Sequence, residues 1–209
     1  IGLVAASGTG LQEVTCLIDR LGGGVSQAIG TGGRDLSPQV GGSTVLMGIE
    51  ALRRDPQTQI IVVLSKPPAP EVARKVLGRL RECGKPAVVH FIGLRGAAAR
   101  SGGRDRVRHA GSLEESAGLA VSLLRGSPYD PRAFSPPEEE LQALAARAAA
   151  GMGAGQRYLR GLFTGGTLAD EALFLLEKEI GEVYSNNQLR PELRLADAHR
   201  SRGHTVVDL

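Results

Sequence analysis

Aromatic residues and cysteines are scarce in this 209-residue chain, which has no tryptophan, two cysteines and only 3% aromatic residues. Single-stranded nucleic acids are usually held by stacking on aromatic rings, so this scarcity argues against a nucleic-acid partner. No apolar run reaches eighteen residues, and we therefore expect no membrane-spanning helix. The formal net charge of +3 is mild and indicates no polyanionic partner by itself.

The two cysteines, Cys16 and Cys83, fall within predicted helices and lack the spacing of a metal site. We expect buried free thiols, no bound metal and a cytoplasmic location. The chain has no signal-peptide pattern. Because it begins without methionine and directly in a predicted strand, we expect a fragment whose N-terminal part is missing.

Short apolar runs alternate with amphipathic helices over residues 1–125. The predicted strands are residues 1–6, 25–29, 60–64, 87–92 and 107–110, and the predicted helices are 10–21, 43–54, 71–83 and 112–124. Strands that alternate with helices of this length form a parallel sheet covered on both faces. We therefore predict an α/β fold with a flavodoxin-like, doubly wound, five-stranded parallel sheet.

The composition changes in residues 126–156, which we interpret as a linker with an Ala/Leu-rich connector helix at residues 138–150. Residues 157–209 begin a second unit of the same kind, with strands predicted at 158–163 and 204–209. Residues 182–203 look polar and irregular. Since two strands and one helix cannot build a closed core, we expect this second domain to be truncated.

A glycine-threonine turn follows a predicted strand twice, and both copies read Gly-Thr-x-x-x-Glu, at residues 8–13 and 166–171. Backbone N–H groups at such a helix start can bind a phosphate or a carboxylate. A capping box between Thr9 and Gln12 is the alternative interpretation of the first turn.

The loop of residues 30–35 combines three glycines with Arg34 and Asp35. It is either an anion cradle clamped by Arg34 or a surface turn with a local Arg34–Asp35 ion pair. Lys66, after the third predicted strand, either adds a positive charge or is simply solvated. Ligands of doubly wound sheets bind beyond the carboxyl ends of the strands, where these turns converge. The candidate anion-binding residues are Ser7, Gly8, Thr9, Gly10, Gly32, Gly33, Lys66, Gly165, Gly166 and Thr167.

Five arginines gather in a loop rich in glycine and alanine, and Asp105 is the one acid among them. They are Arg95, Arg100, Arg104, Arg106 and Arg108. A solvated loop is the favoured interpretation, and capture of an anionic ligand is the second. The chain has neither a P-loop nor a Gly-x-Gly-x-x-Gly motif, which argues against NAD. His109 is a candidate nucleophile that could carry a phosphoryl group, or an ordinary polar residue at a strand end.

The chain resembles the FdrA family of acyl-CoA synthetase-like proteins, which is related to the succinyl-CoA synthetase α subunit. Residues 1–42, 65–68, 84–86 and 161–169 carry the resemblance. It implies that residues 1–125 form a flavodoxin-like ligase domain. It also implies a missing CoA-binding-type domain before the chain and a missing remainder of the second ligase-type domain after it.

In the synthetases, a helix opened by Ser-Gly-Thr points at a phosphohistidine that a glutamate supports. The matching residues here are Ser7, Gly8, Thr9 and Glu13. The synthetase Gly-Gly-Asp loop is similar to residues 32–35, with Arg34 inserted. Synthetases follow His-Ala-Gly with a long glycine-rich loop, whereas here a predicted helix begins directly after His109, Ala110 and Gly111.

The resemblance implies a ligase that handles a phosphate-bearing acyl or carbamoyl donor, with Glu13, Arg34 and His109 as its catalytic residues. CoA, ATP and carbamoyl phosphate are the candidate ligands. One alternative is a subunit of an oxamate carbamoyltransferase in purine (allantoin) breakdown. Another is a non-catalytic regulatory or scaffold subunit that binds CoA or a nucleotide. The expected partners are small anionic substrates and further subunits or a second copy.

Overall fold

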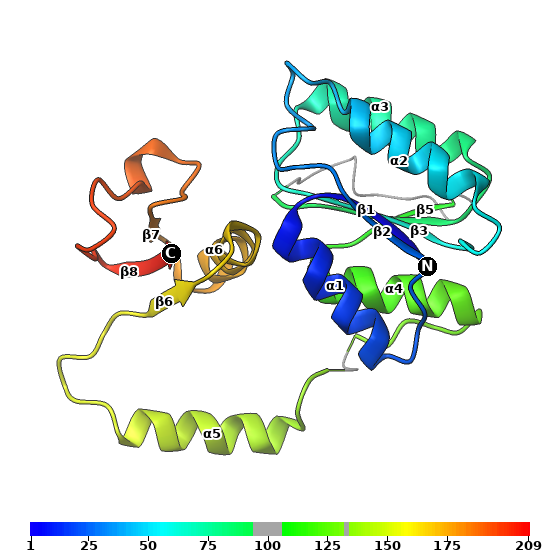
Figure 1. The fold of residues 1–209 in the computed structure, drawn as a ribbon. Helices are drawn as coiled ribbons and strands as arrows, with labels where there is room; N and C mark the ends of the chain where they lie inside the picture. The colour runs from blue at the N-terminus through cyan, green and yellow to red at the C-terminus, as the bar shows by residue number, and fades with distance from the viewer. Residues whose placement is uncertain (94–105, 132–133) are drawn as a thin grey trace.

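A computed structural model describes residues 1–93, 106–131 and 134–209. Its first unit is a five-stranded sheet in the order β2-β1-β3-β4-β5, with every neighbouring pair parallel (Figure 1). The strands are β1 (Gly2–Ala6), β2 (Gln27–Gly30), β3 (Ile61–Ser65), β4 (Ala87–Phe91) and β5 (Val107–His109). This is the strand order of flavodoxin-like doubly wound sheets, so the predicted fold class is confirmed.

Helices cover both faces of this sheet (Figure 1). The first face is covered by α1 (Gly8–Arg20) and α4 (Leu113–Arg125), and the second by α2 (Ser43–Arg54) and α3 (Pro70–Glu82). Successive strand side chains point to opposite faces, so each strand feeds two cores. For example, Val62 packs with α1 and α4, whereas Val63 packs with α2 and α3. This double burial explains why β3 is apolar without alternation.

The second unit is a smaller parallel sheet in the order β6-β8-β7, next to α6 (Gly166–Ile180). Its strands are β6 (Arg160–Phe163), β7 (Val183–Ser185) and β8 (His204–Asp208). The prediction of two strands was wrong, since residues 182–203 contain β7 and a 3-10 helix at Pro191–Leu193. A three-residue strand is too short to show a hydrophobic period.

Helix α5 (Glu138–Ala150) has the predicted bounds and none of its residues is buried. Alanine and leucine favour the helix intrinsically, and the glutamates of its first turn complement the helix dipole. It stands apart from both sheets in Figure 1. The domain boundaries of 1–125, 126–156 and 157–209 stay a prediction.

The two cysteines differ in exposure. Cys16 lies on the solvent side of α1 and is exposed, so its predicted burial was wrong, whereas Cys83 is buried directly after α3.

No helix in the described ranges is long and apolar enough to cross a membrane. In the arginine-rich loop, Arg95, Arg100 and Arg104 lie outside the described residues. Exposed Arg106 donates to the Gly84 carbonyl, and Arg108 is also exposed.

Candidate functional site

The carboxyl ends of β1, β2 and β3 bring three of the predicted turns to one edge of the sheet. The parallel register aligns Ala6 with Ser65, so the turns after β1 and β3 leave the sheet side by side. On the other side of β1, Thr31 N–H donates to the Ala5 carbonyl at 2.9 Å and ties down the start of the loop of residues 30–35. The crevice between β1 and β3 is where doubly wound sheets bind ligands.

Ser7 caps α1, with its Oγ accepting from Gly10 N–H at 3.2 Å. The helix begins at Gly8, so Thr9 lies inside it and the capping-box alternative for Thr9 and Gln12 was wrong. Within the described residues, the N–H groups of Gly8 and Thr9 donate to no protein acceptor. A Cβ at Gly8 would meet no described atom within 4 Å. One side of this helix start is therefore open to a ligand.

The two glycine-threonine turns meet. Ser7 Oγ and Thr167 Oγ1 are 2.7 Å apart and share a hydrogen bond across 160 residues of sequence. A Cβ at Gly165 would lie 2.5 Å from Thr9 Cγ2, and a Cβ at Gly10 would lie 3.0 Å from Thr167 Cγ2. Glycine at both positions is what lets the helix starts approach so closely, so α6 covers the side of the α1 start that faces it.

Carboxylates of the second unit bind two of the predicted anion-binding residues, Gly165 and Lys66. Gly165 N–H donates to Asp208 Oδ1 at 3.1 Å. Lys66, expected as an anion ligand, lies 3.0 Å from Asp170 Oδ2 in an ion pair. Asn187 donates to the other oxygen of Asp170 at 2.7 Å. Burial raises the pKa of Asp170, and the neighbouring Lys66 ammonium opposes that rise.

The glutamates of the two repeated motifs also lie close to each other. Glu171 Oε1 accepts from Leu113 N–H at 2.6 Å, which places a carboxylate of α6 at the start of α4. Burial raises the pKa of Glu171, the Leu113 bond lowers it, and the charges of Glu13 and Glu114 raise it further. Glu13 itself is half-buried. Glu171 therefore has a structural partner, while Glu13 remains the candidate for chemistry.

The surface-turn interpretation expected an ion pair between Arg34 and Asp35, and this expectation was wrong. Asp35 is buried, and its carboxylate accepts from the N–H groups of Thr44 at 3.2 Å and Val45 at 2.8 Å, at the start of α2. Arg34 is exposed beside a cavity of about 440 Å³ between the loops that follow β2 and β3. Its lining includes Gly33, Arg34, Ser37, Ser65, Pro68 and Glu71.

His109 ends β5, the edge strand, and is half-buried. Three strand spacings separate β5 from β1, which is about 14 Å. His109 therefore ends a strand that does not border the crevice between β1 and β3. As predicted, a helix follows at once, with Ser112 capping α4.

His90 on β4 is a buried polar residue that the sequence analysis missed. Its Nδ1 lies 2.9 Å from the Ala110 carbonyl, and burial lowers its pKa, so the neutral ring donates through Nδ1. Its buried Nε2 has no partner among the described residues. A histidine inside the apolar run of β4 was the available signal. Its hydrogen bond holds the turn that follows His109.

Together these observations define a doubly wound α/β domain whose carboxyl edge carries an open helix start and a glycine-rich loop. The CoA binding domain family model matches residues 1–93, and such a domain is found in succinyl-CoA synthetase α-like proteins. The resemblance had placed a CoA-binding-type domain before this chain, whereas the match falls on its first 93 residues. The FdrA resemblance itself stays a prediction.

Among curated proteins, the Uncharacterized protein YahF of Escherichia coli (strain K12) is 47% identical over 210 residues. That alignment covers 100% of this chain and 39% of the relative, so the chain spans well under half of its length. Among solved structures, a de novo designed Rossmann 2x3 fold protein matches with a TM-score of 0.38 and 11% identity. It covers 65% of this chain and 97% of that one.

Proposed function

We propose that this chain belongs to an acyl-CoA synthetase of the succinyl-CoA ligase type and holds CoA in the cavity beside Arg34. The observation that carries the proposal is the position of that cavity. Every residue that lines it falls within residues 1–93, which match the CoA binding domain. The cavity also lies at the carboxyl edge of the sheet, and its 440 Å³ is within the ordinary range for small-molecule sites.

The cavity offers CoA two kinds of contact. The guanidinium of Arg34 can bind a phosphate group with two parallel hydrogen bonds. A Cβ at Gly32 or Gly33 would meet no described atom within 4 Å, so the backbone beside Arg34 is open to the same phosphates. Pro67 and Pro68 supply apolar walls for the rest of the ligand.

The open start of α1 is the proposed place for the second, phosphate-bearing reactant. The N–H groups of Gly8 and Thr9 would stabilise negative charge that develops on a transferred phosphoryl or carbonyl group. Glu13, one turn further along α1, is the proposed acid–base or supporting group. Because Lys66 is engaged by Asp170, Arg34 is the cation that this proposal relies on for ligand binding.

Calorimetric titration of CoA into the full protein tests the proposal. We expect saturable binding, which Arg34→Ala weakens about tenfold to a hundredfold, the usual effect of losing charge-assisted hydrogen bonds. Arg34→Lys should retain part of the affinity, since it keeps the charge and loses the bidentate geometry. Arg157→Ala, which removes an exposed arginine three residues before β6, is the matched control. Absence of CoA binding, or equal affinity in Arg34→Ala, contradicts the proposal.

A carbamoyltransferase subunit is the second candidate, and the position of His109 favours it, since carbamoyl transfer needs no phosphohistidine. Incubation with labelled ATP separates the two. A ligase should form an acid-labile phosphohistidine that His109→Asn abolishes, whereas a carbamoyltransferase should transfer the carbamoyl group without labelling. If Glu13→Gln and Arg34→Ala both leave turnover unchanged, the chain has a regulatory or scaffold role instead.

A further inference from the structure

The outer surface of α2 and α3 forms an open groove of about 670 Å³, on a different part of the molecule from the cavity beside Arg34. Leu46, Met47 and Ala51 of α2 give it an apolar floor, and Met47 is 72% exposed. A Cβ at Gly78 of α3 would meet no described atom within 4 Å, so another helix can approach closely there.

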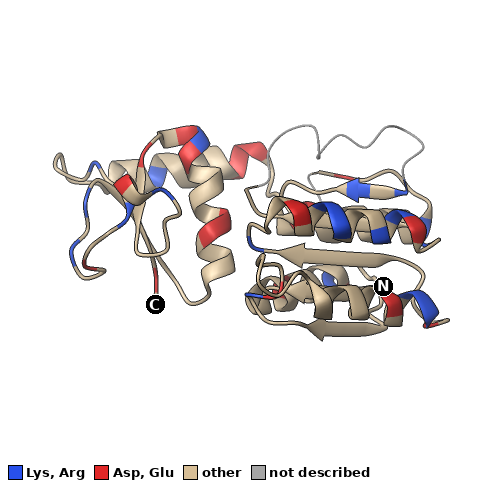
Figure 2. Cartoon of the chain, turned by 90° about the horizontal axis from the view of Figure 1, so that it is seen from above, with Lys and Arg blue, Asp and Glu red and all other residues tan. Residues whose placement is uncertain are grey.

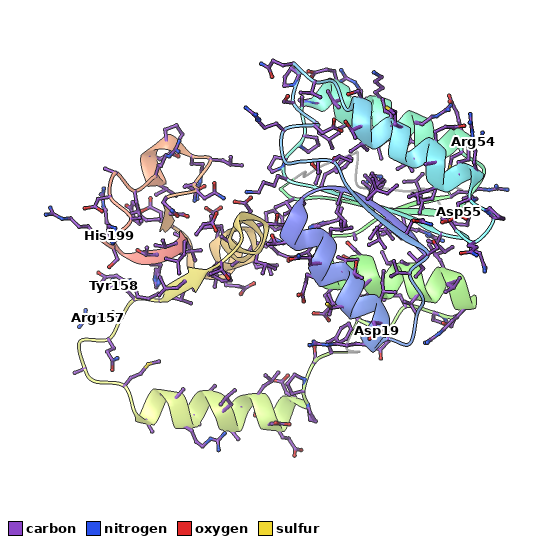
Figure 3. All side chains as sticks on the ribbon, viewed as in Figure 1. Asp19, Arg54, Asp55, Arg157, Tyr158 and His199 are labelled. Carbon is purple, nitrogen blue, oxygen red and sulfur yellow. The ribbon has the colours of Figure 1, made fainter. Side chains whose placement is uncertain are left out.

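The rim of this groove has an excess of positive charge. Glu50 alone accepts hydrogen bonds from three arginines, at 2.7 Å from Arg53, 2.6 Å from Arg54 and 2.7 Å from Arg79. In and beside the groove, four cations face two carboxylates: Arg53, Arg54, Lys75, Arg79, Glu50 and Glu82. Figure 2 shows basic and acidic residues interspersed along these helices, and Figure 3 shows Arg54 at the end of α2. The groove therefore suits an acidic partner with an apolar face.

Helix α5 has complementary properties. Leu141, Leu144, Ala145 and Ala148 recur at the spacing that places them on one helix face, and the two leucines are 40% and 54% exposed. Three glutamates fill its first turn, and Arg147 is its one cation. The side chains of α5 stand clear of the other elements in Figure 3. This is an amphipathic helix without a partner in the part of the chain that the structure describes.

We propose that α5 of one copy docks into the α2–α3 groove of a second copy in a head-to-tail contact. Lengths agree, because α2, α3 and α5 have 12, 13 and 13 residues and each is about 18–20 Å long. Within one copy, α5 and the groove lie on opposite sides of the molecule (Figure 1). Surfaces that face opposite ways cannot both meet the same second copy, so the contact is heterologous, and each copy uses its α5 and its groove with two different neighbours.

Charge also sets the direction of docking. Helices α2 and α3 each lead from one parallel strand back to the next, so they run the same way and both end near Arg54 and Arg79. An antiparallel α5 brings residues 138–140 to that basic end. In this antiparallel orientation the dipole of α5 also points against the dipoles of α2 and α3, which is favourable. The small alanine face of α5 allows the close interaxial distance that the open space at Gly78 offers.

Disulfide trapping in the full protein tests the identity of the occupant. In a Cys16→Ser background, which removes the exposed native thiol and leaves Cys83 buried, Met47→Cys and Leu144→Cys are prepared separately. Mild oxidation of the mixture should give a linked dimer with one chain of each kind. A linked dimer from Leu144→Cys alone would instead show pairing of two α5 helices. An internal disulfide in the Met47→Cys/Leu144→Cys chain, without dimer, would show docking within one copy. Either result overturns the proposal, as does the absence of any linked product.

Sedimentation velocity supplies an independent test in which the fold is unchanged, because the altered side chains are exposed. Leu141→Glu/Leu144→Glu and Met47→Glu should each weaken self-association by about tenfold or more. Leu162→Glu is the matched control, since Leu162 is 72% exposed on β6, outside the proposed contact, and this variant should associate as the unaltered protein does. A monomeric unaltered protein, or self-association that the α5 and groove variants leave unchanged, overturns the proposal.

Discussion

Asp35→Ala should loosen the start of α2 and with it the loop that carries Arg34. The N-cap position of α2 is Gly42, which has no side chain to accept from the first helical N–H groups. Asp35 supplies those acceptors from seven residues upstream, with bonds to Thr44 and Val45. Its negative charge also lies at the positive end of the helix dipole. One buried carboxylate therefore links the stability of α2 to the geometry of the candidate CoA cavity.

The expected loss of unfolding free energy follows from the acceptor that each of the two N–H groups loses. Removal of an N-cap acceptor costs about 0.5–2 kcal/mol. Val45 is fully buried, so water is poorly placed to replace the lost acceptor, and an unsatisfied buried N–H costs about 1–3 kcal/mol. Allowing for overlap between these two effects, we expect Asp35→Ala to lose about 2–3 kcal/mol of unfolding free energy. Asp35→Asn keeps one accepting oxygen and should lose about half as much.

Urea unfolding followed by circular dichroism measures this loss as a lower midpoint at an unchanged slope. Arg34→Ala is the matched control, because it alters an exposed neighbour in the same loop and should shift stability by no more than about 0.5 kcal/mol. Asp35→Ala should also weaken CoA binding, since the loop that holds Arg34 is no longer anchored. A stability equal to that of Arg34→Ala would refute the assigned role of Asp35.

Three further predictions concern packing and pH. Gly48→Ala should destabilise the protein by about 1–3 kcal/mol, because the new Cβ would lie 2.7 Å from Val4 Cγ2. Gly78→Ala places its Cβ in open space and should stabilise the protein by up to about 1 kcal/mol. Thermal unfolding compares the two variants. Burial lowers the pKa of His90 below 6.5. The neutral ring therefore contributes stability above pH 6.5, and this contribution should be lost as the pH falls through the lowered pKa. Melting curves across pH should show a smaller loss for His90→Gln. Glu171 has the opposite pH dependence, because its pKa in the folded protein is raised above 4.5. Its contribution to stability is present below pH 4.5 and lost as the pH rises through that raised pKa. Glu171→Gln should flatten this decline in stability.

Most of the first unit could be predicted because its signals are local. The β-branched run of β3 and the helical period of α2 each lie within a dozen residues, and α2 and α5 have their predicted bounds. Strand β7 was missed for the opposite reason. Its three residues form a strand only by pairing with β8, about twenty residues later in the chain. The exposure of Cys16 likewise depends on which side of α1 faces the sheet.

The sequence by itself determined the parallel architecture and the convergence of the glycine-rich turns at one edge, because the alternation of strands with helices follows from patterns along the chain. Only the tertiary structure decided how the polar groups at that edge are used. It joins Ser7 to Thr167 and Lys66 to Asp170, and it turns Asp35 toward α2. Two of these contacts join residues more than a hundred positions apart, and their energies depend on distance and burial in space, which spacing along a chain does not encode.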